Sequence, residues 1–155
     1  LAENIEDYIV FTSPNSDPGS KKIIQSISKF IDKYPNRSTF ITSAGREAYI
    51  NLVRHAELLI GNSSSCLIEA PALKTKSLII GKRQDGRPLA SSVLKAGISY
   101  QSIKNNIKNL IKKNTGKIDK QEKLSYSGVD SLSKILKILS TYSLKNIKYK
   151  TFNDQ

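Results

Sequence analysis

Three consecutive serines, Ser63, Ser64 and Ser65, follow an apolar segment and the pair Gly61-Asn62, and one acid, Glu69, stands a few residues further on. Small residues at the start of a helix let an anion approach unpaired backbone N–H groups, and serine hydroxyls add donors. A carboxylate is a poor phosphate ligand, but it accepts hydrogen bonds from ribose hydroxyls. The stretch therefore indicates a site for a phosphate joined to a ribose. The plainer alternative is that Ser63 only caps a helix and that Glu69 is a solvated helix residue.

A second candidate is the loop of residues 81–88, GKRQDGRP, in which Arg83 and Arg87 stand four apart beside Gly81 and Gly86. A guanidinium fork binds phosphate oxygens through two parallel hydrogen bonds, and glycines let the backbone come close to a ligand. The loop is thus typical of an anion site. The alternative is a turn with two exposed arginines.

The third candidate is the loop of residues 12–20, TSPNSDPGS, which contains the polar residues Asn15 and Asp17. The alternative here is a plain proline turn that caps the next helix through Asp17 or Ser20. We favour that alternative for Asp17. Asn15 stays open between a binding role and a turn role.

Alternating strand and helix patterns connect these loops. Because strands separated by such helices form right-handed crossovers, the pattern predicts an α/β fold with a parallel sheet flanked by helices, in one domain over residues 1–142 with a tail at 143–155. Ligands bind at the carboxyl ends of such strands, so the three loops are expected to converge on one edge of the sheet. The predicted strands are 7–14, 38–43, 57–61, 76–81 and a weak 97–100, and the predicted helices are 20–34, 46–56, 63–73 with an interruption at Pro71, 101–113 and 129–142.

Composition narrows the function classes. The chain has 155 residues, 38% of them hydrophobic and 25% charged, as in an ordinary globular domain. It has no apolar run of membrane-span length and no signal-peptide pattern, so we expect a cytoplasmic protein without a membrane partner. Its one cysteine, Cys66, excludes an internal disulfide. No metal site or cofactor is predicted. A chain that begins at Leu1 and contains no Met is expected to be the downstream piece of something larger.

The formal net charge of +12 is concentrated toward the end of the chain, with +4 on residues 1–100 and +8 on residues 101–155. Lysines spread over amphipathic helices are typical of solvated faces, and no aromatic residues are interleaved with arginine. We therefore predict no nucleic-acid partner.

In this order and spacing, PNSDPGS, GNSSSCLIEAP and GKRQDGR resemble the C-terminal half of the hydrolysing UDP-N-acetylglucosamine 2-epimerases of sialic and related nonulosonic acid synthesis. The resemblance covers residues 7–115 and implies the C-terminal, Rossmann-like domain of a two-domain, glycosyltransferase-B-like fold. It implies that Ser63 and Ser64, with Ser65 beside them, hold the diphosphate, that Glu69 holds the ribose, and that Arg83, Arg87 and Asn15 line the nucleotide pocket.

The resemblance also implies the chemistry: elimination of UDP across two sugar carbons, then hydration to N-acetylmannosamine. The residues that perform those steps are expected in a missing N-terminal domain, so no catalytic residue is assigned here and the fragment alone is expected to be inactive. A homo-oligomer is implied by the resemblance alone. His55 is interpreted as structural. Cys66 stands where the family often has a small residue, and no base accompanies it to make it reactive.

Two alternatives remain. The chain could be the nucleotide-sugar domain of a two-domain glycosyltransferase, or a free-standing nucleotide-binding module without catalysis. A glycosyltransferase is expected to show a pair of acids after the phosphate loop, whereas one acid, Glu69, follows it here. The sequence 83–87, RQDGR, also favours the epimerase.

Overall fold

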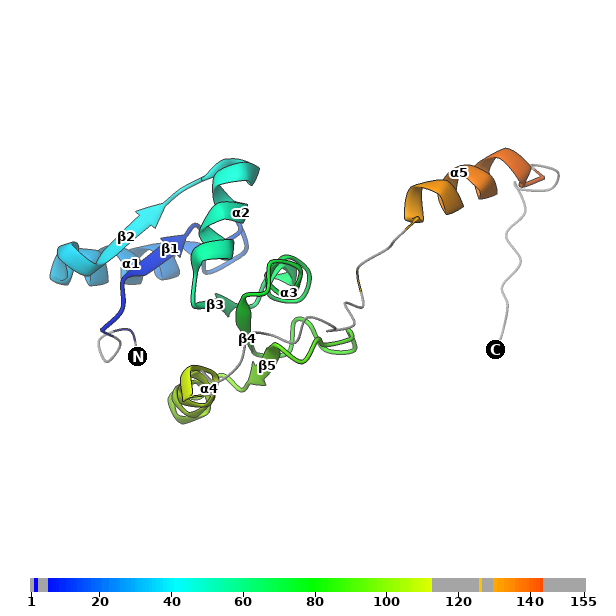
Figure 1. The fold of residues 1–155 in the computed structure, drawn as a ribbon. Helices are drawn as coiled ribbons and strands as arrows, with labels where there is room; N and C mark the ends of the chain where they lie inside the picture. The colour runs from blue at the N-terminus through cyan, green and yellow to red at the C-terminus, as the bar shows by residue number, and fades with distance from the viewer. Residues whose placement is uncertain (1, 3–5, 113–125, 127–129, 144–155) are drawn as a thin grey trace. The chain divides into compact units, whose positions relative to one another are not determined.

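The computed structural model describes Ala2, residues 6–112, Tyr126 and residues 130–143. Figure 1 shows the elements in order along the chain. They are β1 Ile9–Thr12, α1 Ser20–Lys33, η2 Pro35–Arg37, β2 Ser38–Ile41, α2 Gly45–His55, β3 Leu58–Gly61, η3 Ser64–Cys66, α3 Glu69–Ala72, β4 Lys76–Ile80, β5 Val93–Ala96, α4 Tyr100–Lys112 and α5 Ser131–Thr141.

The chain divides into two compact units, Leu1–Ser125 and Tyr126–Gln155. The first contains every described strand and α1 to α4, and the second contains α5. The boundary predicted at residue 142 stays a prediction, and the predicted tail lies outside the described residues except for Ser143.

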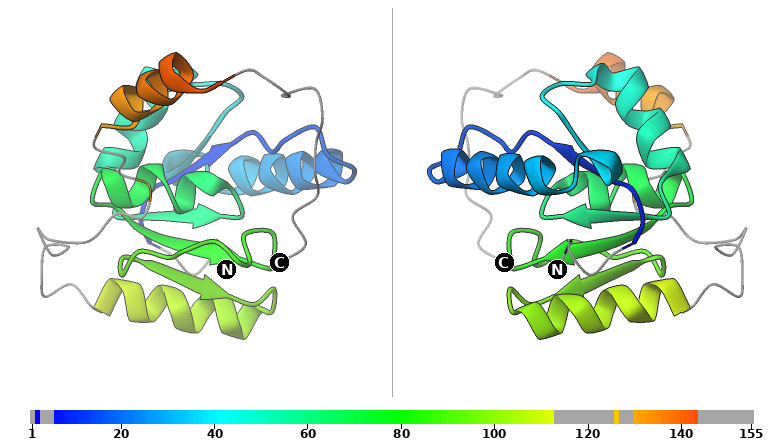
Figure 2. Two further views of the ribbon diagram at one scale, coloured as in Figure 1. Left: turned by 90° about the vertical axis from the view of Figure 1, so that its right-hand side faces the viewer. Right: turned by 90° about the vertical axis from the view of Figure 1, so that its left-hand side faces the viewer.

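All described strands pair in parallel, which confirms the α/β fold with parallel strands flanked by helices. In Figure 2 the arrowheads of β3, β4 and β5 point to the same side of the first unit. The central strand β4 pairs with β3 from Leu58↔Lys76 onward and with β5 from Ser77↔Val93 onward. Because these strands run parallel, the loops after β3 and β4 leave the sheet at the same edge.

Successive side chains of β4 point to opposite faces of this three-stranded sheet, and both faces are covered by other parts of the chain. Ile79 packs in a buried cluster with Cys66 and Leu67 of the segment that follows β3. On the opposite face Leu78 packs with Ile107 of α4. The full clusters are Cys66, Leu67, Ile79 and Val93 on one face, and Leu78, Ala96, Ile107 and Leu110 on the other.

The helix α4 is fixed to the sheet at its last turn. Lys76, at the start of β4, donates from Nζ to the carbonyl of Leu110 at 2.9 Å. A cation at the C-terminus of a helix satisfies a carbonyl that has no partner within the helix, and it interacts favourably with the helix dipole.

The strand pair β1–β2 forms a separate two-stranded sheet, whereas the sequence predicted one sheet. No backbone pairing joins it to the three-stranded sheet within the described residues. Val10 of β1 and Ile60 of β3 remain 39% and 38% exposed, as expected for short strands that lack a partner on one side. The helix α1 packs on the pair, with the Phe30 ring edge-on to Phe11 at 5.5 Å between centroids.

The start of α1 corrects one prediction. The residue before it is Gly19, in a left-handed conformation with φ 95°, and no side chain makes a capping hydrogen bond. Asp17 contributes its backbone carbonyl, which accepts from the N–H of Ser20 at 3.1 Å. A glycine can take this φ without strain, so the turn closes through the backbone and needs no capping by Asp17 or Ser20 side chains.

The last strand also differs from its prediction. It spans Val93–Ala96, not residues 97–100. Val93 and Ala96 are buried, whereas Ile98 is 85% exposed. The Ser99 hydroxyl accepts from the N–H of Ser102 at 3.2 Å, which starts α4 at the point where a strand was expected.

The helix α5 of the second unit has an exposed apolar face, with Leu132 at 70% and Leu139 at 72% exposure. None of the helices in the described part of the chain combines the length and apolar character needed to cross a membrane.

Candidate functional site

The serine segment is not one helix, although the sequence predicted a helix over residues 63–73. A short 3-10 turn, η3, is followed by the four-residue helix α3. Proline has no N–H and its ring clashes with the carbonyl four residues earlier, so a continuous helix cannot run through Pro71. Pro71 instead lies in the first turn of α3, where it is tolerated. Glu69 is therefore the first residue of α3, not an interior residue of the helix predicted over residues 63–73.

This break changes the argument for an anion. A four-residue helix contributes little macrodipole, so attraction for phosphate must come from individual N–H and hydroxyl groups. The Ser63 hydroxyl accepts from the N–H of Ser65 at 3.3 Å, so Ser63 does cap the short turn. Among the described residues, no acceptor is recorded for the N–H of Ser63 or of Ser64. Two donors are thus left for a ligand or for water.

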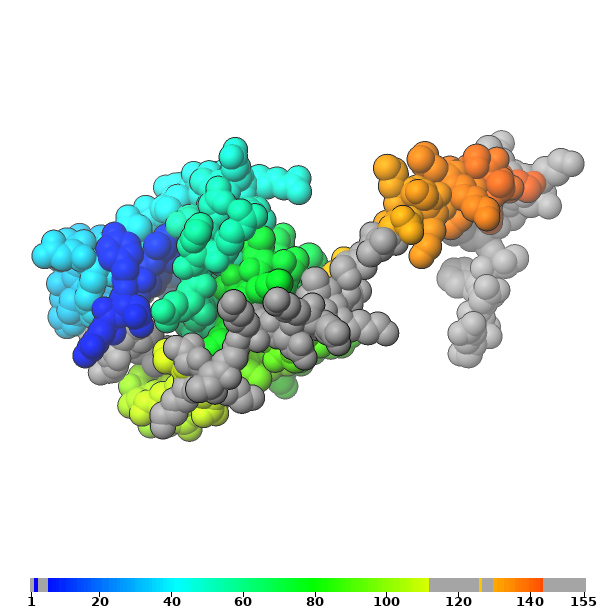
Figure 3. All heavy atoms as spheres, viewed as in Figure 1, coloured from blue at the N-terminus to red at the C-terminus, as the bar shows by residue number. Residues whose placement is uncertain are grey.

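Ser65 is held by a neighbouring helix. Tyr49 of α2 donates from its hydroxyl to the Ser65 Oγ at 2.7 Å, and Ser65 is buried. Figure 3 shows the atoms of α2 against those of the α3 region in one continuous surface. The Ser65 Oγ therefore accepts one hydrogen bond, and the hydroxyl keeps its hydrogen and a second lone pair for another partner.

Glu69 is half-buried, and its Oε2 is buried with no hydrogen-bond partner among the described residues. A buried carboxylate oxygen without a donor is destabilising unless something supplies one. This finding argues against the alternative in which Glu69 is a solvated residue. It leaves a carboxylate beside the serine turn whose hydrogen-bonding capacity is unfilled.

Cys66 has no chemistry of its own here. It is 1% exposed, and burial raises the pKa of its thiol to about 11, partly offset by a backbone hydrogen bond and increased further by the Glu69 carboxylate. At neutral pH the thiol is protonated and is a poor nucleophile. Its carbonyl accepts from the Ser77 hydroxyl of β4 at 2.6 Å, which fixes η3 to the sheet.

The loop of residues 81–88 is fixed at its first residue and in its middle. The N–H of Gly81 donates to the carbonyl of Ala96 at 2.9 Å, and Asp85 forms an ion pair with Lys95 of β5. Gly81 and Gly86 both take left-handed conformations, with φ 78° and 80°, that side chains other than glycine rarely adopt. Arg83 and Arg87 are exposed, and neither forms an ion pair with another described residue.

The residue that joins this loop to the serine segment is Gln84, which the sequence prediction missed. Gln84 is 4% exposed, and its Nε2 donates to the carbonyl of Asn62 at 2.9 Å. Its Oε1 is buried without a partner. A glutamine between two charged residues in a Gly-rich loop gave no hydrophobic or spacing signal. The part that Gln84 plays is seen only from its position between the two loops in the folded chain.

The third candidate loop, residues 12–20, follows β1. Figure 2 shows β1 running toward the same edge of the first unit as β3, β4 and β5. Asn15 is exposed, and no recorded hydrogen bond joins it to the other two loops.

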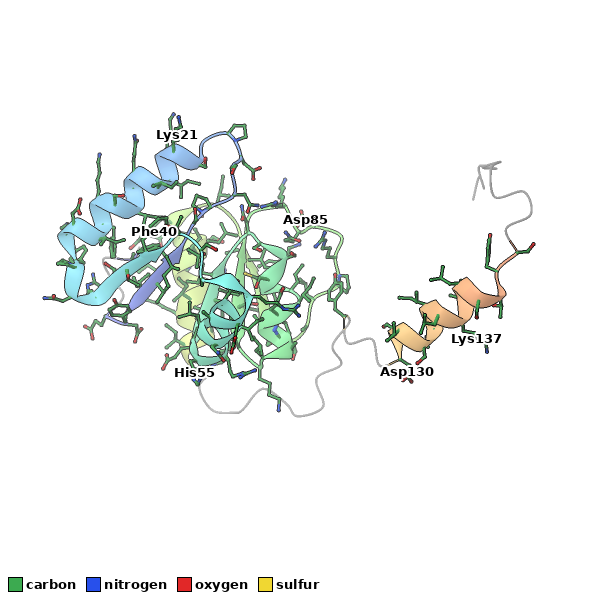
Figure 4. All side chains as sticks on the ribbon, turned by 90° about the horizontal axis from the view of Figure 1, so that it is seen from above. Lys21, Phe40, His55, Asp85, Asp130 and Lys137 are labelled. Atoms are coloured by element: carbon green, nitrogen blue, oxygen red, sulfur yellow. The ribbon has the colours of Figure 1, made fainter. Side chains whose placement is uncertain are left out.

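Figure 4 shows His55, the last residue of α2, at the end of the unit away from Lys21 and Asp85. His55 is therefore remote from the candidate site.

The structure thus brings two of the three loops into contact. The serine segment and the arginine-bearing loop are joined by Gln84, and α2 supports them through Tyr49. The binding roles of Asn15, Ser63, Ser64, Ser65, Glu69, Arg83 and Arg87 stay predictions. Within the described residues, no three His, Cys, Asp or Glu side chains are grouped so as to hold a metal ion.

A parallel α/β fold with two polar loops joined at the carboxyl edge of its strands defines a domain of the Rossmann-like class, in which ligands bind at that edge. Comparison with known proteins adds the family. The family model described as UDP-N-acetylglucosamine 2-epimerase matches residues 1–140. The chain belongs to this family.

Three curated relatives illustrate the match. The chain is 37% identical over 101 residues to polysialic acid biosynthesis protein P7 of Escherichia coli, covering 65% of this chain and 25% of that protein. It is 30% identical over 91 residues to the GDP/UDP-N,N'-diacetylbacillosamine 2-epimerase (hydrolyzing) of Campylobacter jejuni, covering 59% and 24%. It is 29% identical over 113 residues to the UDP-N,N'-diacetylbacillosamine 2-epimerase (hydrolyzing) of Legionella pneumophila, covering 73% and 29%. The chain spans about a quarter of the length of these relatives.

Proposed function

We propose that this chain is the UDP-binding half of a hydrolysing UDP-N-acetylglucosamine 2-epimerase. The diphosphate is held by the backbone N–H groups and hydroxyls of Ser63 and Ser64, with Ser65 beside them. The ribose is held by Glu69, and Arg83 and Arg87 approach the phosphates from the neighbouring loop. Asn15 lines the pocket from the loop after β1.

The observation that carries the proposal is the hydrogen bond between Gln84 and Asn62, which holds the arginine-bearing loop against the serine segment. Two N–H donors without an acceptor and two exposed guanidinium groups therefore lie on loops that are joined to each other, and groups of these kinds together bind a diphosphate.

The ribose part of the proposal is supported by the Glu69 carboxylate. Its buried Oε2 lacks a donor, and phosphate oxygens have none to give at neutral pH. A ribose supplies two hydroxyl donors. A small rotation of the Glu69 side chain on binding would exchange an unsatisfied acceptor for a satisfied one.

The reaction of the whole enzyme needs groups beyond this chain. We propose that the elimination and hydration are carried out by an N-terminal domain on the other side of the nucleotide sugar, and that the intact cytoplasmic protein is a homo-oligomer. Relatives named as diacetylbacillosamine 2-epimerases favour a second candidate for the sugar, a diacetamido relative of N-acetylglucosamine.

The experiment is calorimetric titration of UDP into the 155-residue chain and into its Glu69→Ala and Arg83→Ala variants. The proposal predicts micromolar to millimolar affinity that is lost in both variants. Arg54→Ala and Glu57→Ala are matched controls, because both residues are exposed, Arg54 in the last turn of α2 and Glu57 immediately before β3. Absence of UDP binding in the wild type, or equal binding in all five proteins, would contradict the proposal.

A further inference from the structure

Gln84 makes a hydrogen bond whose direction is chemically unambiguous. Only its NH2 group can donate to the Asn62 carbonyl, so the bond of 2.9 Å fixes Nε2 toward Asn62 and leaves Oε1 on the other side. That Oε1 is buried and has no partner among the described residues. The amide orientation therefore follows from the bonding and does not depend on a choice between two equivalent flips.

An apolar side chain of similar size would fill the same space without leaving an acceptor unsatisfied. Gln84 is 4% exposed, so the penalty for that acceptor is not relieved by solvent. The bond to Asn62 is the only interaction through which the polar amide offsets this penalty among the described residues. Asn62 itself is exposed, so this bond fixes a surface loop and not the buried core.

The bond controls more than one atom. The carbonyl of Asn62 and the N–H of Ser63 belong to the same planar, trans peptide unit, in which they point in opposite directions. Holding the carbonyl toward Gln84 therefore holds the N–H of Ser63 away from it. Among the described residues that N–H has no recorded acceptor.

We propose that Gln84 is a positioning residue for the anionic part of the ligand, because it orients the Asn62–Ser63 peptide so that the Ser63 N–H is presented to a diphosphate. This inference rests on the proposed function and adds a residue to it. Gln84 itself touches no phosphate in this account, and it acts through the peptide plane that it holds.

The test compares two ligands that differ only in the diphosphate, UDP and uridine, in the wild-type chain and in Gln84→Met. Methionine has a similar length and no donor, so the peptide is released while the space stays filled. Loss of one hydrogen bond to a charged group weakens UDP binding by about tenfold or more. Uridine affinity, measured by competition, stays within about twofold because its contacts do not use the Ser63 N–H.

A merely structural role predicts a different pattern. If Gln84 only stabilised the fold, Gln84→Met would lower the urea midpoint of unfolding and weaken UDP and uridine alike. A positioning role predicts an unchanged or higher urea midpoint, because the substitution also removes a buried unsatisfied acceptor. Wild-type binding of UDP with an unchanged UDP-to-uridine ratio in Gln84→Met would overturn this inference alone. No UDP binding in the wild type would overturn the proposed function as well.

The Gln84→Glu variant gives a second readout. A buried carboxyl group has a raised pKa, and its protonated form can donate to the Asn62 carbonyl as the amide does. UDP affinity of Gln84→Glu relative to wild type is therefore expected to recover as pH falls. Such a group titrates within a range of about pH 5 to 8. A ratio of Gln84→Glu to wild-type UDP affinity that does not change over this range would contradict the positioning role.

Discussion

The hydroxyl of Tyr49 donates to the Oγ of Ser65 at 2.7 Å, which joins the middle of α2 to the serine segment after β3. Ser65 is buried and the segment has no long helix to stabilise it. The position of the candidate phosphate site therefore depends on a helix that contributes no ligand contact of its own in this account.

Tyr49→Phe is expected to remove this bond while it keeps the ring packing. The free energy of unfolding should fall by about 1 kcal/mol, because the buried Ser65 hydroxyl loses its partner. UDP affinity should fall by a few-fold through loss of order in the segment. Urea denaturation and calorimetry measure the two effects. Tyr8→Phe is the matched control, since Tyr8 is 58% exposed, and an equal loss in both variants would contradict the account.

Glu69→Gln is expected to change stability and binding in opposite directions. A neutral amide is less costly to bury than a carboxylate whose Oε2 lacks a donor, so the free energy of unfolding should rise by up to about 1 kcal/mol. UDP affinity should fall, because the charged acceptor for the ribose hydroxyls is gone. Thermal unfolding and UDP titration of the same preparation test the pair of signs. A fall in both quantities would indicate that the carboxylate is structural.

The buried thiol predicts a loss of stability at alkaline pH. The pKa of Cys66 is about 11 in the folded chain, above the ordinary thiol value of 9.0, so the folded state binds the proton more tightly than the unfolded state does. This contribution is fully present below pH 9.0 and is lost as pH rises toward 11, by about 1.4 kcal/mol for each pH unit in between. Urea denaturation across this range should show a steeper decline for the wild type than for Cys66→Ala. Parallel declines would mean that the thiol ionises with the same pKa in both states.

The centre of the three-stranded sheet is expected to be the most sensitive part of the core. Leu78 is 0% exposed, and Leu78→Ala should lower the free energy of unfolding by about 2–5 kcal/mol through lost burial and the cavity left behind. Ile98→Ala, at 85% exposure, should change it by less than about 0.5 kcal/mol. Chemical denaturation measures both. Similar losses in the two variants would contradict the assignment of Leu78 to the core.

Much of the fold followed from hydrophobic patterning. The first four strands and the helices α1, α2, α4 and α5 lie where apolar periodicity places them, although their ends differ by a few residues. The errors in the predicted elements came from single residues whose local preferences compete with the apolar pattern. Pro71 excludes a continuous helix over residues 63–73, and Ser99 starts α4 where a strand was expected. The division of the strands into two sheets depends on pairing between distant segments, which periodicity does not encode.

The candidate site was only partly accessible to sequence reasoning. Residue types indicated anion binding at Ser63, Ser64 and Arg83, because small hydroxyl residues and arginine in Gly-rich loops carry a chemical signal. Gln84 and Tyr49 act through single hydrogen bonds to residues 22 and 16 positions away along the chain. Such bonds depend on the folded arrangement, so composition and spacing do not reveal them.

Contact between the diphosphate and the serine segment can be observed directly by following the backbone amides of Ser63 and Ser64 by NMR during titration of the isotope-labelled chain with UDP. We expect these two amides to show the largest shift changes, because their N–H groups are the donors without an acceptor that meet the diphosphate. Uridine at the same occupancy should leave both nearly unchanged. UDP-induced shifts confined to residues away from the serine segment and the loop of residues 81–88 would contradict the claim.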